Sequence, residues 1–456
     1  MKRTAHRTCP LCEATCGLEI TIEDERVKVI RGDQQDPFSK GFLCPKGSTL
    51  GRLRDDPDRL RTPLIKQDRV HVEATWDEAW EAVAAGLGPP LEADRNSVAI
   101  YVGNPNAHSF QAPLALRPLI KAIGTRNSFS ASTVDQMPRQ VACAHLFGGG
   151  LLTPVPDIDR TDYLLILGAN PYESNGSLAT APDWPGRLEA IRSRGGTVVV
   201  VDPRRTKTAK NADRHLAIRP GTDAALLLAI ISVLFSEGLV DLGRLEGHVT
   251  GIDEVAEAAE RFTPHTVEHS TGIAADEIQR LAREIAAAPS AAVYGRIGNH
   301  TVAFGTVAAW AADVINVLTG NLDRPGGVMF TKPIHQPASR PPRTFRPGRW
   351  TSRVRGLPEV FGELPVATMA DEMLTEGEGQ VRALVTVAGN PVLTTPHAGR
   401  LDEAIAGLEF MVSVDPYLNE TTRHADVILP VPPALESSHF DLAFTVLAVR
   451  NVAKYS

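Results

Sequence analysis

The chain has 456 residues, with 47 lysines and arginines against 54 aspartates and glutamates, and a formal net charge of −7. Hydrophobic residues make up 43% and charged residues 22%, which suits a globular protein of about three domains. The negative charge argues against nucleic-acid binding through bulk positive charge. No apolar run reaches the roughly 18 residues of a membrane span, and no apolar stretch follows the N-terminal charges as in a secretory signal. A cytoplasmic location is therefore expected.

Four of the five cysteines lie near the N-terminus, at Cys9, Cys12, Cys16 and Cys44. Their spacing is C-x2-C-x3-C-x27-C. Three close thiolates on one loop plus a distant fourth suit the corners of a [4Fe–4S] cluster, whereas structural zinc more often takes two CxxC-like pairs. The fifth cysteine, Cys143, stands alone, so a disulfide framework is not expected. The pattern favours an iron–sulfur cluster and leaves zinc as the alternative.

The elements that follow alternate between strand and helix. Between the third and fourth cysteines, two alternating runs predict a small hairpin. Later apolar runs are continuous, as in parallel strands that are buried on both faces. The predicted strands are 97–102, 163–167, 197–201, 291–294, 381–387 and 410–414, and the predicted helices are 113–123 and 221–238. This order predicts an α/β fold with mainly parallel sheets.

One turn recurs three times after an apolar strand, as Gly103-Asn104-Pro105, Gly168-Ala169-Asn170-Pro171 and Gly389-Asn390-Pro391. Glycine permits close backbone approach, and open α/β sheets bind ligands at the carboxyl ends of their strands. One copy would be an ordinary turn, but three copies favour the binding of a nucleotide-like ligand. The segment 331–350, rich in proline and basic residues, is either an extended loop or a basic rim for an anionic partner.

Three further segments share a pattern with the cysteines. They are 202–223, beginning Asp202-Pro203-Arg204; 316–327, with Leu318-Thr319-Gly320-Asn321; and 415–430, beginning Asp415-Pro416-Tyr417. Together with the cysteine spacing, they resemble the molybdopterin oxidoreductase family, the dimethyl sulfoxide reductase and formate dehydrogenase group. The combination covers residues 9 to about 436 and is highly specific, although no single segment is.

The resemblance implies a bis-molybdopterin guanine dinucleotide cofactor with molybdenum or tungsten. Tight Gly/Asn turns can offer N–H groups to pyrophosphate, and a carboxylate past a strand can receive ribose or guanine N–H and O–H groups. The implied residues for one pterin nucleotide are Gly168, Asn170, Asp202, Arg204, Thr206, Gly221 and Asp223, and those for the other are Gly389, Asn390, Asp415, Thr421 and Asp426. Asp223 could instead be a helix N-cap. Lys46 is implied to bridge cluster and pterin; alone, it would be a surface lysine.

The implied domains are an iron–sulfur domain at 1–62 and two Rossmann-like α/β domains. One of these is discontinuous, at 63–129 and 298–456, and the other spans 130–297. The family continues with a further, largely β domain that closes over the pterins. The present sequence stops in mid-pattern at 450–456, so that domain is expected to be missing, either because the chain is a fragment or because a separate chain supplies it.

The resemblance also implies a side-chain ligand to the metal within 130–138. Matching the proline three residues after the family's ligand places Asp135 there, and a carboxylate suits a high-valent metal. Ser132 and Thr133 are alternatives within a small register shift. Cys143 is a softer alternative, although a buried structural cysteine is the plainer interpretation, and a fourth alternative is that no protein ligand exists.

Two departures from the formate dehydrogenase pattern concern the substrate. Gln136 stands where those enzymes have histidine, and Trp310 stands where they have arginine. Without an imidazole and a guanidinium, formate oxidation loses its usual support, so oxo transfer or another two-electron reaction is expected. His300 is either a pocket residue or a structural histidine.

The expected function is therefore a molybdenum or tungsten oxidoreductase that passes electrons between a small-molecule substrate and the [4Fe–4S] cluster, with a redox partner protein. Two alternatives stay open. One is an electron-transfer or structural subunit without a working metal site, and the other is a non-redox hydratase with the same cofactors.

Overall fold

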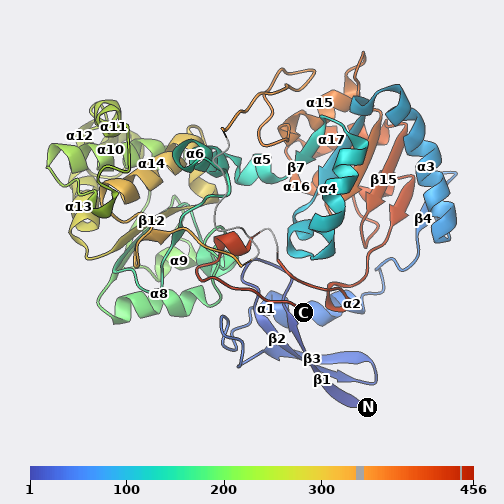
Figure 1. Cartoon of the computed structure of the whole chain (residues 1–456), viewed down its shortest axis with the longest axis horizontal. Coiled ribbons are helices and arrows are strands. Elements are labelled where there is room, and N and C mark those ends of the chain that lie inside the picture. Colours follow the sequence, from blue (N-terminus) through green and yellow to red (C-terminus); the bar gives the residue numbers. More distant parts are fainter. Residues whose placement is uncertain (335–343, 442–443) are drawn as a thin grey trace.

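The N-terminal part of the computed structural model is a three-stranded antiparallel sheet of β1 (Lys2–Thr8), β2 (Gly17–Glu23) and β3 (Arg26–Gly32). The predicted hairpin corresponds to β2 and β3. Strand β1 was not predicted, because its polar residues are mostly exposed and carry no apolar alternation. The structure describes residues 1–334, 344–441 and 444–456. In this part of the chain, two α/β lobes lie side by side and the small sheet lies beneath them (Figure 1).

The first lobe, the four-stranded lobe, contains the parallel strands β11 (Arg214–Leu216), β10 (Thr197–Val201), β9 (Tyr163–Leu167) and β12 (Ala291–Gly295), in that order. Alternate residues of β9 face opposite sides. Leu165 and Leu167 pack with helices α10 (Asp223–Ser236), α13 (Ala275–Ala287) and α14 (Gly305–Leu318), and Leu164 and Ile166 pack with α8 (Trp184–Ser193). Burial on both faces explains why β9 and β10 are apolar without a break.

The second lobe, the seven-stranded lobe, has the strand order β5-β4-β16-β15-β14-β6-β7. The strands are β4 (Leu64–Gln67), β5 (Val70–Glu73), β6 (Val98–Val102), β7 (Ser128–Ser130), β14 (Ala383–Val387), β15 (Phe410–Val414) and β16 (Val427–Leu429). All pairs are parallel except β16–β4 and β4–β5. Helices α3 (Trp76–Ala93) and α4 (Gln111–Ile123) cover one face, and α15 (Met369–Leu374) and α17 (Ala398–Ala406) cover the other.

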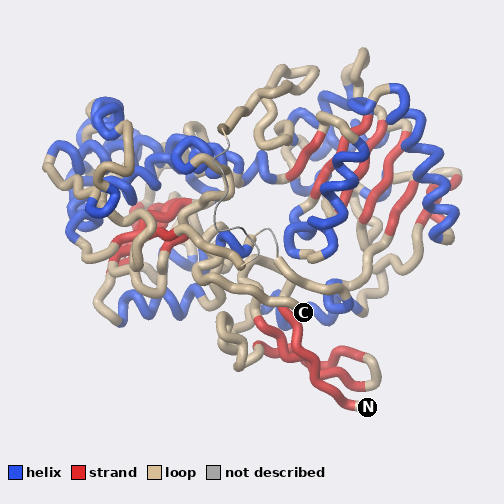
Figure 2. The backbone as a smooth tube through the Cα atoms, in the orientation of Figure 1, coloured by secondary structure: helices blue, strands red, loops and turns tan. Residues whose placement is uncertain are grey.

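The remaining elements are short and are mostly connections at the ends of the strands (Figure 2). They are α1 (Pro45–Ser48), α2 (Leu50–Arg54), α5 (Ser132–Asp135), α6 (Met137–Phe147), α7 (Pro171–Ser174), α9 (Lys207–Lys210), α11 (Ile252–Ala259), α12 (Pro264–Thr271), α16 (Pro391–Thr394), β8 (Val155–Pro156) and β13 (Val328–Met329), with 3-10 turns η1 (Arg95–Ser97), η2 (Asn104–His108), η3 (Gly243–Leu245), η4 (Ile297–Asn299), η5 (Val366–Thr368), η6 (Thr422–His424), η7 (Ala434–Glu436) and η8 (Thr445–Leu447).

The predicted α/β class with mainly parallel sheets is confirmed. Of the segment 331–350, residues 335–343 lie outside the described residues, so the choice between loop and basic rim is not decided there. No helix in the described ranges has both the length and the apolar content that crossing a bilayer requires.

Candidate active site

The four N-terminal cysteines lie in one apolar neighbourhood. Cys9 and Cys16 are buried among Leu18, Ile20 and Leu50, and Cys12 and Cys44 are half-buried. The loop closes through the Cys9 N–H, which donates to the Cys16 carbonyl at 2.8 Å. A Cβ on Gly47 would lie 3.6 Å from the Cys9 sulfur and 2.4 Å from Leu43 Cδ1, so glycine there lets helix α1 approach the loop.

Burial raises the pKa of Cys9 to about 12 and also raises the pKa values of Cys12 and Cys16, and the neighbouring cysteines add to each rise. These thiols therefore stay protonated until a metal takes up the thiolates. In the described part of the chain, no three His, Cys, Asp or Glu side chains gather as one metal ion would need. A cluster binds its four thiolates at separate corners, and four thiols around an apolar space fit that donor set.

Lys46 is exposed and lies between the cysteine loop and the four-stranded lobe. Its charge opposes the rise in the pKa values of Cys9 and Cys12. The same charge helps to lower the pKa of Glu173 in α7, which follows the Gly168–Asn170 turn, although the ion pair of Glu173 with Lys207 at 2.6 Å has the larger effect. The structure thus places Lys46 near both the cysteines and that turn.

The Gly/Asn turns of the two lobes have the same hydrogen bonds. Asn170 Oδ1 accepts from Thr208 Oγ1 at 2.7 Å, and Thr208 Oγ1 accepts from the backbone N–H that follows Pro171 at 3.2 Å. In the other lobe, Asn390 Oδ1 accepts from Thr421 Oγ1 at 2.6 Å, and Thr421 Oγ1 accepts from the N–H that follows Pro391 at 3.1 Å. Each lobe therefore holds a rigid turn at the carboxyl edge of its sheet.

Glycine is required at the first of these turns. Gly168 has a φ of +55°, and a Cβ on it would lie 2.6 Å from the backbone nitrogen of Asn299. The backbone at 168 therefore lies directly against the loop after β12. In the other lobe the equivalent residue is Ala388, with a φ of +52°, and the glycine comes one residue later. Gly389 approaches Tyr101, where a Cβ would lie 2.5 Å from Cε1 of the ring. Both turns leave their backbone close to the edge where a ligand of an open sheet binds.

Carboxylates follow the neighbouring strand in both lobes. Asp202 Oδ1 accepts from the N–H of Arg204 at 2.8 Å, and Asp415 Oδ1 accepts from the N–H of Tyr417 at 2.9 Å. Burial raises the pKa of Asp415. In the four-stranded lobe, a second carboxyl, Asp223, begins α10 after Gly221; burial and, to a lesser extent, the charge of Asp202 raise its pKa to about 6. Such carboxyl groups can accept the N–H and O–H groups of a nucleotide.

Two of the predicted site residues, Thr206 and Asp426, form hydrogen bonds outside the Asn–Thr turns. Thr206 Oγ1 accepts the N–H of Ala209 at 3.1 Å as the N-cap of α9, and the threonine bound to Asn170 is Thr208. Asp426 precedes β16, and its carboxylate accepts the N–H of Met411 at 2.7 Å near the start of β15. Because this is the amino edge of the sheet, the structure does not bring Asp426 to Asn390 and Asp415. The expectation that Asp426 belongs to the nucleotide site has no geometric support.

Asp135 ends the short helix α5 between the lobes, and its side chain is 38% exposed. Arg296, the first residue after β12, contacts its carboxylate at 3.7 Å and donates to its backbone carbonyl at 3.4 Å. Burial raises the pKa of Asp135, the Arg296 charge lowers it, and the nearby Glu13 raises it further. Asp135 therefore lies within electrostatic range of the cysteine loop as well as of the four-stranded lobe.

The alternatives to Asp135 have hydrogen-bond partners within the protein, and Cys143 is also more deeply buried. Thr133 Oγ1 accepts from the N–H of Val366 at 3.0 Å, and Ser132 Oγ accepts from Gln136 Nε2 at 3.2 Å. Cys143 is fully buried in α6, 3.6 Å from Thr153 Oγ1. These contacts give each of the three a partner within the protein fold.

Arg296, Glu13 and Ser177 were missed in the sequence. Arg296 is buried and donates from Nε to Ser177 Oγ at 3.0 Å. Arg296 lies two residues after the predicted strand 291–294, and Glu13 directly follows Cys12, so their positions next to predicted features could have indicated them. His300 is 1% exposed, and burial and the charges of Arg139 and Arg296 hold its pKa well below the usual range. It is a neutral, enclosed imidazole.

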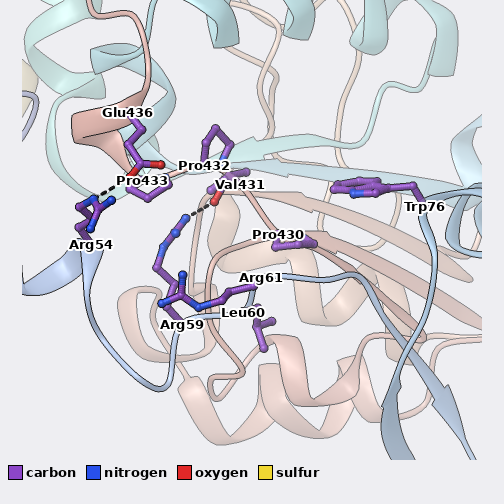
Figure 3. A pocket seen from close by; sticks show the side chains of 10 residues that line it. All are labelled: Arg54, Arg59, Leu60, Arg61, Trp76, Pro430, Val431, Pro432, Pro433 and Glu436. Atoms are coloured by element: carbon purple, nitrogen blue, oxygen red, sulfur yellow. Dashed lines mark hydrogen bonds and ion pairs between the residues drawn. The ribbon is translucent and has the colours of Figure 1, made fainter. Parts of the chain in front are cut away.

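A cavity of about 300 Å³ lies at the carboxyl end of β16, with Arg59, Arg61, Trp76 and residues 430–433 in its walls (Figure 3). It adjoins the Asp415 turn, because the Leu60 N–H donates to the Pro416 carbonyl at 2.8 Å. Arg59 is 8% exposed and donates to the Val431 carbonyl, and neither Arg59 nor Arg61 has an ion-pair partner among the described residues. Two unpaired guanidinium groups make this cavity suited to an anion.

The fold and this site define a class of protein: an α/β protein with a four-cysteine loop and a Gly/Asn turn at the carboxyl edge of each of its two parallel sheets. The Fe4S4 domain of molybdopterin oxidoreductases matches residues 3–54, and the molybdopterin oxidoreductase model matches residues 59–445. The chain belongs to the molybdopterin oxidoreductase family, and its N-terminal part belongs to the Fe4S4 domain of that family.

Relatives include a formate dehydrogenase alpha subunit of Methanococcus maripaludis, which is 27% identical over 94% of this chain and 64% of its own length. A nitrate reductase of Symbiobacterium thermophilum is 30% identical over 92% of this chain and 59% of its own length. The solved acetylene hydratase of Pelobacter acetylenicus has a TM-score of 0.80 at 21% identity, covering 95% of this chain and 64% of the other. The chain thus spans less than two thirds of the length of these relatives.

Proposed function

We propose that the chain is the catalytic part of a molybdenum or tungsten oxidoreductase with a bis-molybdopterin guanine dinucleotide cofactor and a [4Fe–4S] cluster. The observation that carries this proposal is the repeated Asn–Thr turn with an aspartate after the next strand, at the carboxyl edge of both sheets. A cofactor with two guanine dinucleotides needs two such places. When bound, the metal and its pterins supply two-electron chemistry on the substrate, and the cluster passes single electrons onward.

In this proposal the residues divide by the group that they hold. Cys9, Cys12, Cys16 and Cys44 hold the cluster, and Lys46 lies between cluster and pterin. One nucleotide is held by Gly168, Asn170, Asp202, Arg204, Thr206, Gly221 and Asp223, with Thr208 supporting Asn170; the other is held by Gly389, Asn390, Asp415 and Thr421. The cavity with Arg59 and Arg61 adjoins the second set and supports an anionic pyrophosphate there. The domain limits 1–62, 63–129 with 298–456, and 130–297 belong to the same proposal, with a correction at 298: α14 (Gly305–Leu318) packs in the core of the four-stranded lobe, because its apolar face covers β9 and β12.

Asp135 is the proposed ligand to the metal. Its backbone carbonyl and carboxylate both contact Arg296, which is itself held by Ser177. Arg296 therefore orients Asp135 and favours its ionised form, which is the form that binds a metal.

Arg296 also bears on the substrate. The motif comparison found Trp310 in place of an arginine, but the structure brings another guanidinium to Asp135 from the end of β12. The two curated relatives are named for formate and nitrate, which are small oxyanions. A guanidinium is the side chain best matched to an oxyanion, so we propose a small oxyanion as the substrate class and a redox partner protein at the cluster.

Metal and nucleotide analysis of the anaerobically purified chain tests the proposal. We expect about four irons, one molybdenum or tungsten and two guanine nucleotides per chain, and loss of iron in Cys44→Ala. Iron without molybdenum, tungsten or nucleotide would replace the proposal by an electron-transfer subunit. Zinc at the cysteines would overturn the cluster assignment.

A further inference from the structure

Lys454, which lies far from the cysteines in the sequence, reaches the cysteine loop. Its Nζ donates to the backbone carbonyl of Thr15 at 2.7 Å and to Asp36 Oδ1 at 2.8 Å. The ion pair with Asp36 Oδ2 is 2.7 Å long, and the two side chains are only 11% and 8% exposed. A buried ion pair of this kind is costly to form, so its place in the fold calls for a reason.

Both charges lie against the backbone around Cys16. Thr15, which accepts from Lys454, directly precedes Cys16 and has a left-handed φ of +45°. Gly17 directly follows it, and a Cβ there would lie 2.6 Å from Cβ of Asp36. The Lys454 charge opposes the burial-driven rise in the pKa of Cys16, whereas Lys46 acts on Cys9 and Cys12.

Each member of the pair has further support. Asp36 Oδ1 also accepts from the N–H of Phe38 at 3.0 Å, the N–H of Ser39 at 2.6 Å and the Ser39 hydroxyl at 2.9 Å. These donors favour the ionised carboxylate even without the lysine. Lys454 Nζ lies 5.4 Å from the centroid of the Phe38 ring, a cation–π contact that remains without the aspartate. Either charge can therefore be removed while the other keeps its surroundings.

We propose that Lys454 and Asp36 form a charge pair that positions the Cys16 segment and tunes the reduction potential of the iron–sulfur cluster. This inference rests on the proposed function only in requiring the cluster. Reduction adds one negative charge to the cluster, so a nearby cation favours the reduced form and a nearby anion disfavours it. Loss of Lys454 should lower the potential, and loss of Asp36 should raise it.

The test is an EPR-monitored redox titration of the full chain with its cluster, with iron and sulfide counted in every sample. We expect a lower midpoint potential in Lys454→Met, a higher one in Asp36→Asn, and a value near wild type in the double variant and in Lys454→Arg. Neutralising the exposed pair Arg283 and Glu237, 2.7 Å apart on the four-stranded lobe, serves as the matched control and should leave the potential unchanged.

If the Lys454–Asp36 pair only stabilised the fold, the variants would give a different result. The iron content would fall in both single variants, most in the double variant, and the potential of the remaining clusters would be unchanged; that result overturns the tuning. If Lys454→Met holds no cluster, Asp36→Asn still decides, because a potential that fails to rise there overturns the inference. A wild-type chain without iron would overturn the proposed function as well, which separates the two failures.

Discussion

The two lobes share their strand order and their Asn–Thr turns, and they differ in the residue that lies beside Asp135. Strands β11-β10-β9-β12 of one lobe correspond in order and direction to β16-β15-β14-β6 of the other. The Asn–Thr hydrogen bond is 2.7 Å long in the first and 2.6 Å in the second. The aspartates that precede β11 and β16 also correspond: Asp213 accepts from the N–H of Val198 at 2.8 Å, and Asp426 accepts from the N–H of Met411 at 2.7 Å. The lobes therefore share the hydrogen bonds that stabilise the Asn–Thr turn and the neighbouring strands.

The lobes differ at the residue that follows β12 in one and β6 in the other. Arg296 follows β12, and its N–H donates to the Leu167 carbonyl at 3.1 Å; Gly103 follows β6, and its N–H donates to the Val387 carbonyl at 2.8 Å. The backbone positions are equivalent, yet one carries a guanidinium that contacts Asp135 and the other carries no side chain. The comparison teaches that the Asn–Thr turn is duplicated between the lobes, whereas the charge beside the proposed metal ligand comes from one lobe alone.

Replacing Arg296 by the residue of the other lobe should have the largest effect. We expect Arg296→Gly to lower the turnover of an oxyanion substrate by about 100- to 1,000-fold, the range for removal of one oriented donor to a charged group. The nucleotide content should stay near wild type, because the turns are intact, and turnover is compared per bound metal because Arg296 also orients Asp135. A viologen-linked assay with metal analysis measures both, and unchanged turnover would remove Arg296 from the site.

The equivalence of the two Asn–Thr turns can be tested by a substitution in each lobe. Asn170→Ala and Asn390→Ala each remove the acceptor of a threonine hydroxyl, and we expect each to weaken one nucleotide by roughly 10- to 100-fold. Guanine nucleotide released by acid should fall from about two per chain towards one in either variant. Asn104→Ala is the control, because the third turn has an exposed asparagine without that threonine contact; a loss there would mean that all three turns bind.

Asp213 and Asp426 should affect folding rather than nucleotide binding. Asp213→Ala and Asp426→Ala each leave a strand N–H without its acceptor, so each should lower the free energy of unfolding by about 1–3 kcal/mol. Urea titration of the two variants measures the effect, and their nucleotide contents should match wild type. Loss of nucleotide from Asp426→Ala at unchanged stability would restore the sequence-based placement of Asp426.

The smallest effect concerns Asp223, which has no counterpart carboxyl in the other lobe. Its pKa of about 6 in the cofactor-free fold lies above the unfolded value near 3.9, so the stability of the fold falls as the pH rises from about 4 to about 6 and is level above that. Asp223→Asn should therefore be about 1–3 kcal/mol more stable than wild type at pH 7, and this difference should vanish below about pH 4. Unfolding at several pH values measures it, with the exposed Glu376→Gln as control; a difference independent of pH would contradict it.

Much of the fold was readable because the strands are strongly apolar. The predicted strands 163–167, 197–201 and 410–414 match β9, β10 and β15 residue for residue, and the helix predicted up to Gly238 ends at Ser236. Strands β11 and β16 are three residues long and were missed, because so short a run has no periodicity.

The site was predictable where one segment of sequence carries it and not where distant segments meet. The sequence predicted the turn at Asn170 but not its hydrogen bond with Thr208, which lies 38 residues further along the chain. The residue predicted in that segment was Thr206. Arg296 lies 161 residues from Asp135, and no spacing rule joins them. Asp426 lies at the amino edge of the sheet, which the sequence did not indicate because the strand that follows it, β16, was not predicted.

The discontinuous sheet also has a consequence for synthesis on the ribosome. Strand β6 pairs with β14 in a register that joins Val98 to Ala383. At about 5–20 residues per second, the edge of β6 waits roughly 15–60 s for its partner, long enough for the four-stranded lobe to form in between. An open strand edge is a template for aggregation, so this interval is when the nascent chain should depend most on a chaperone.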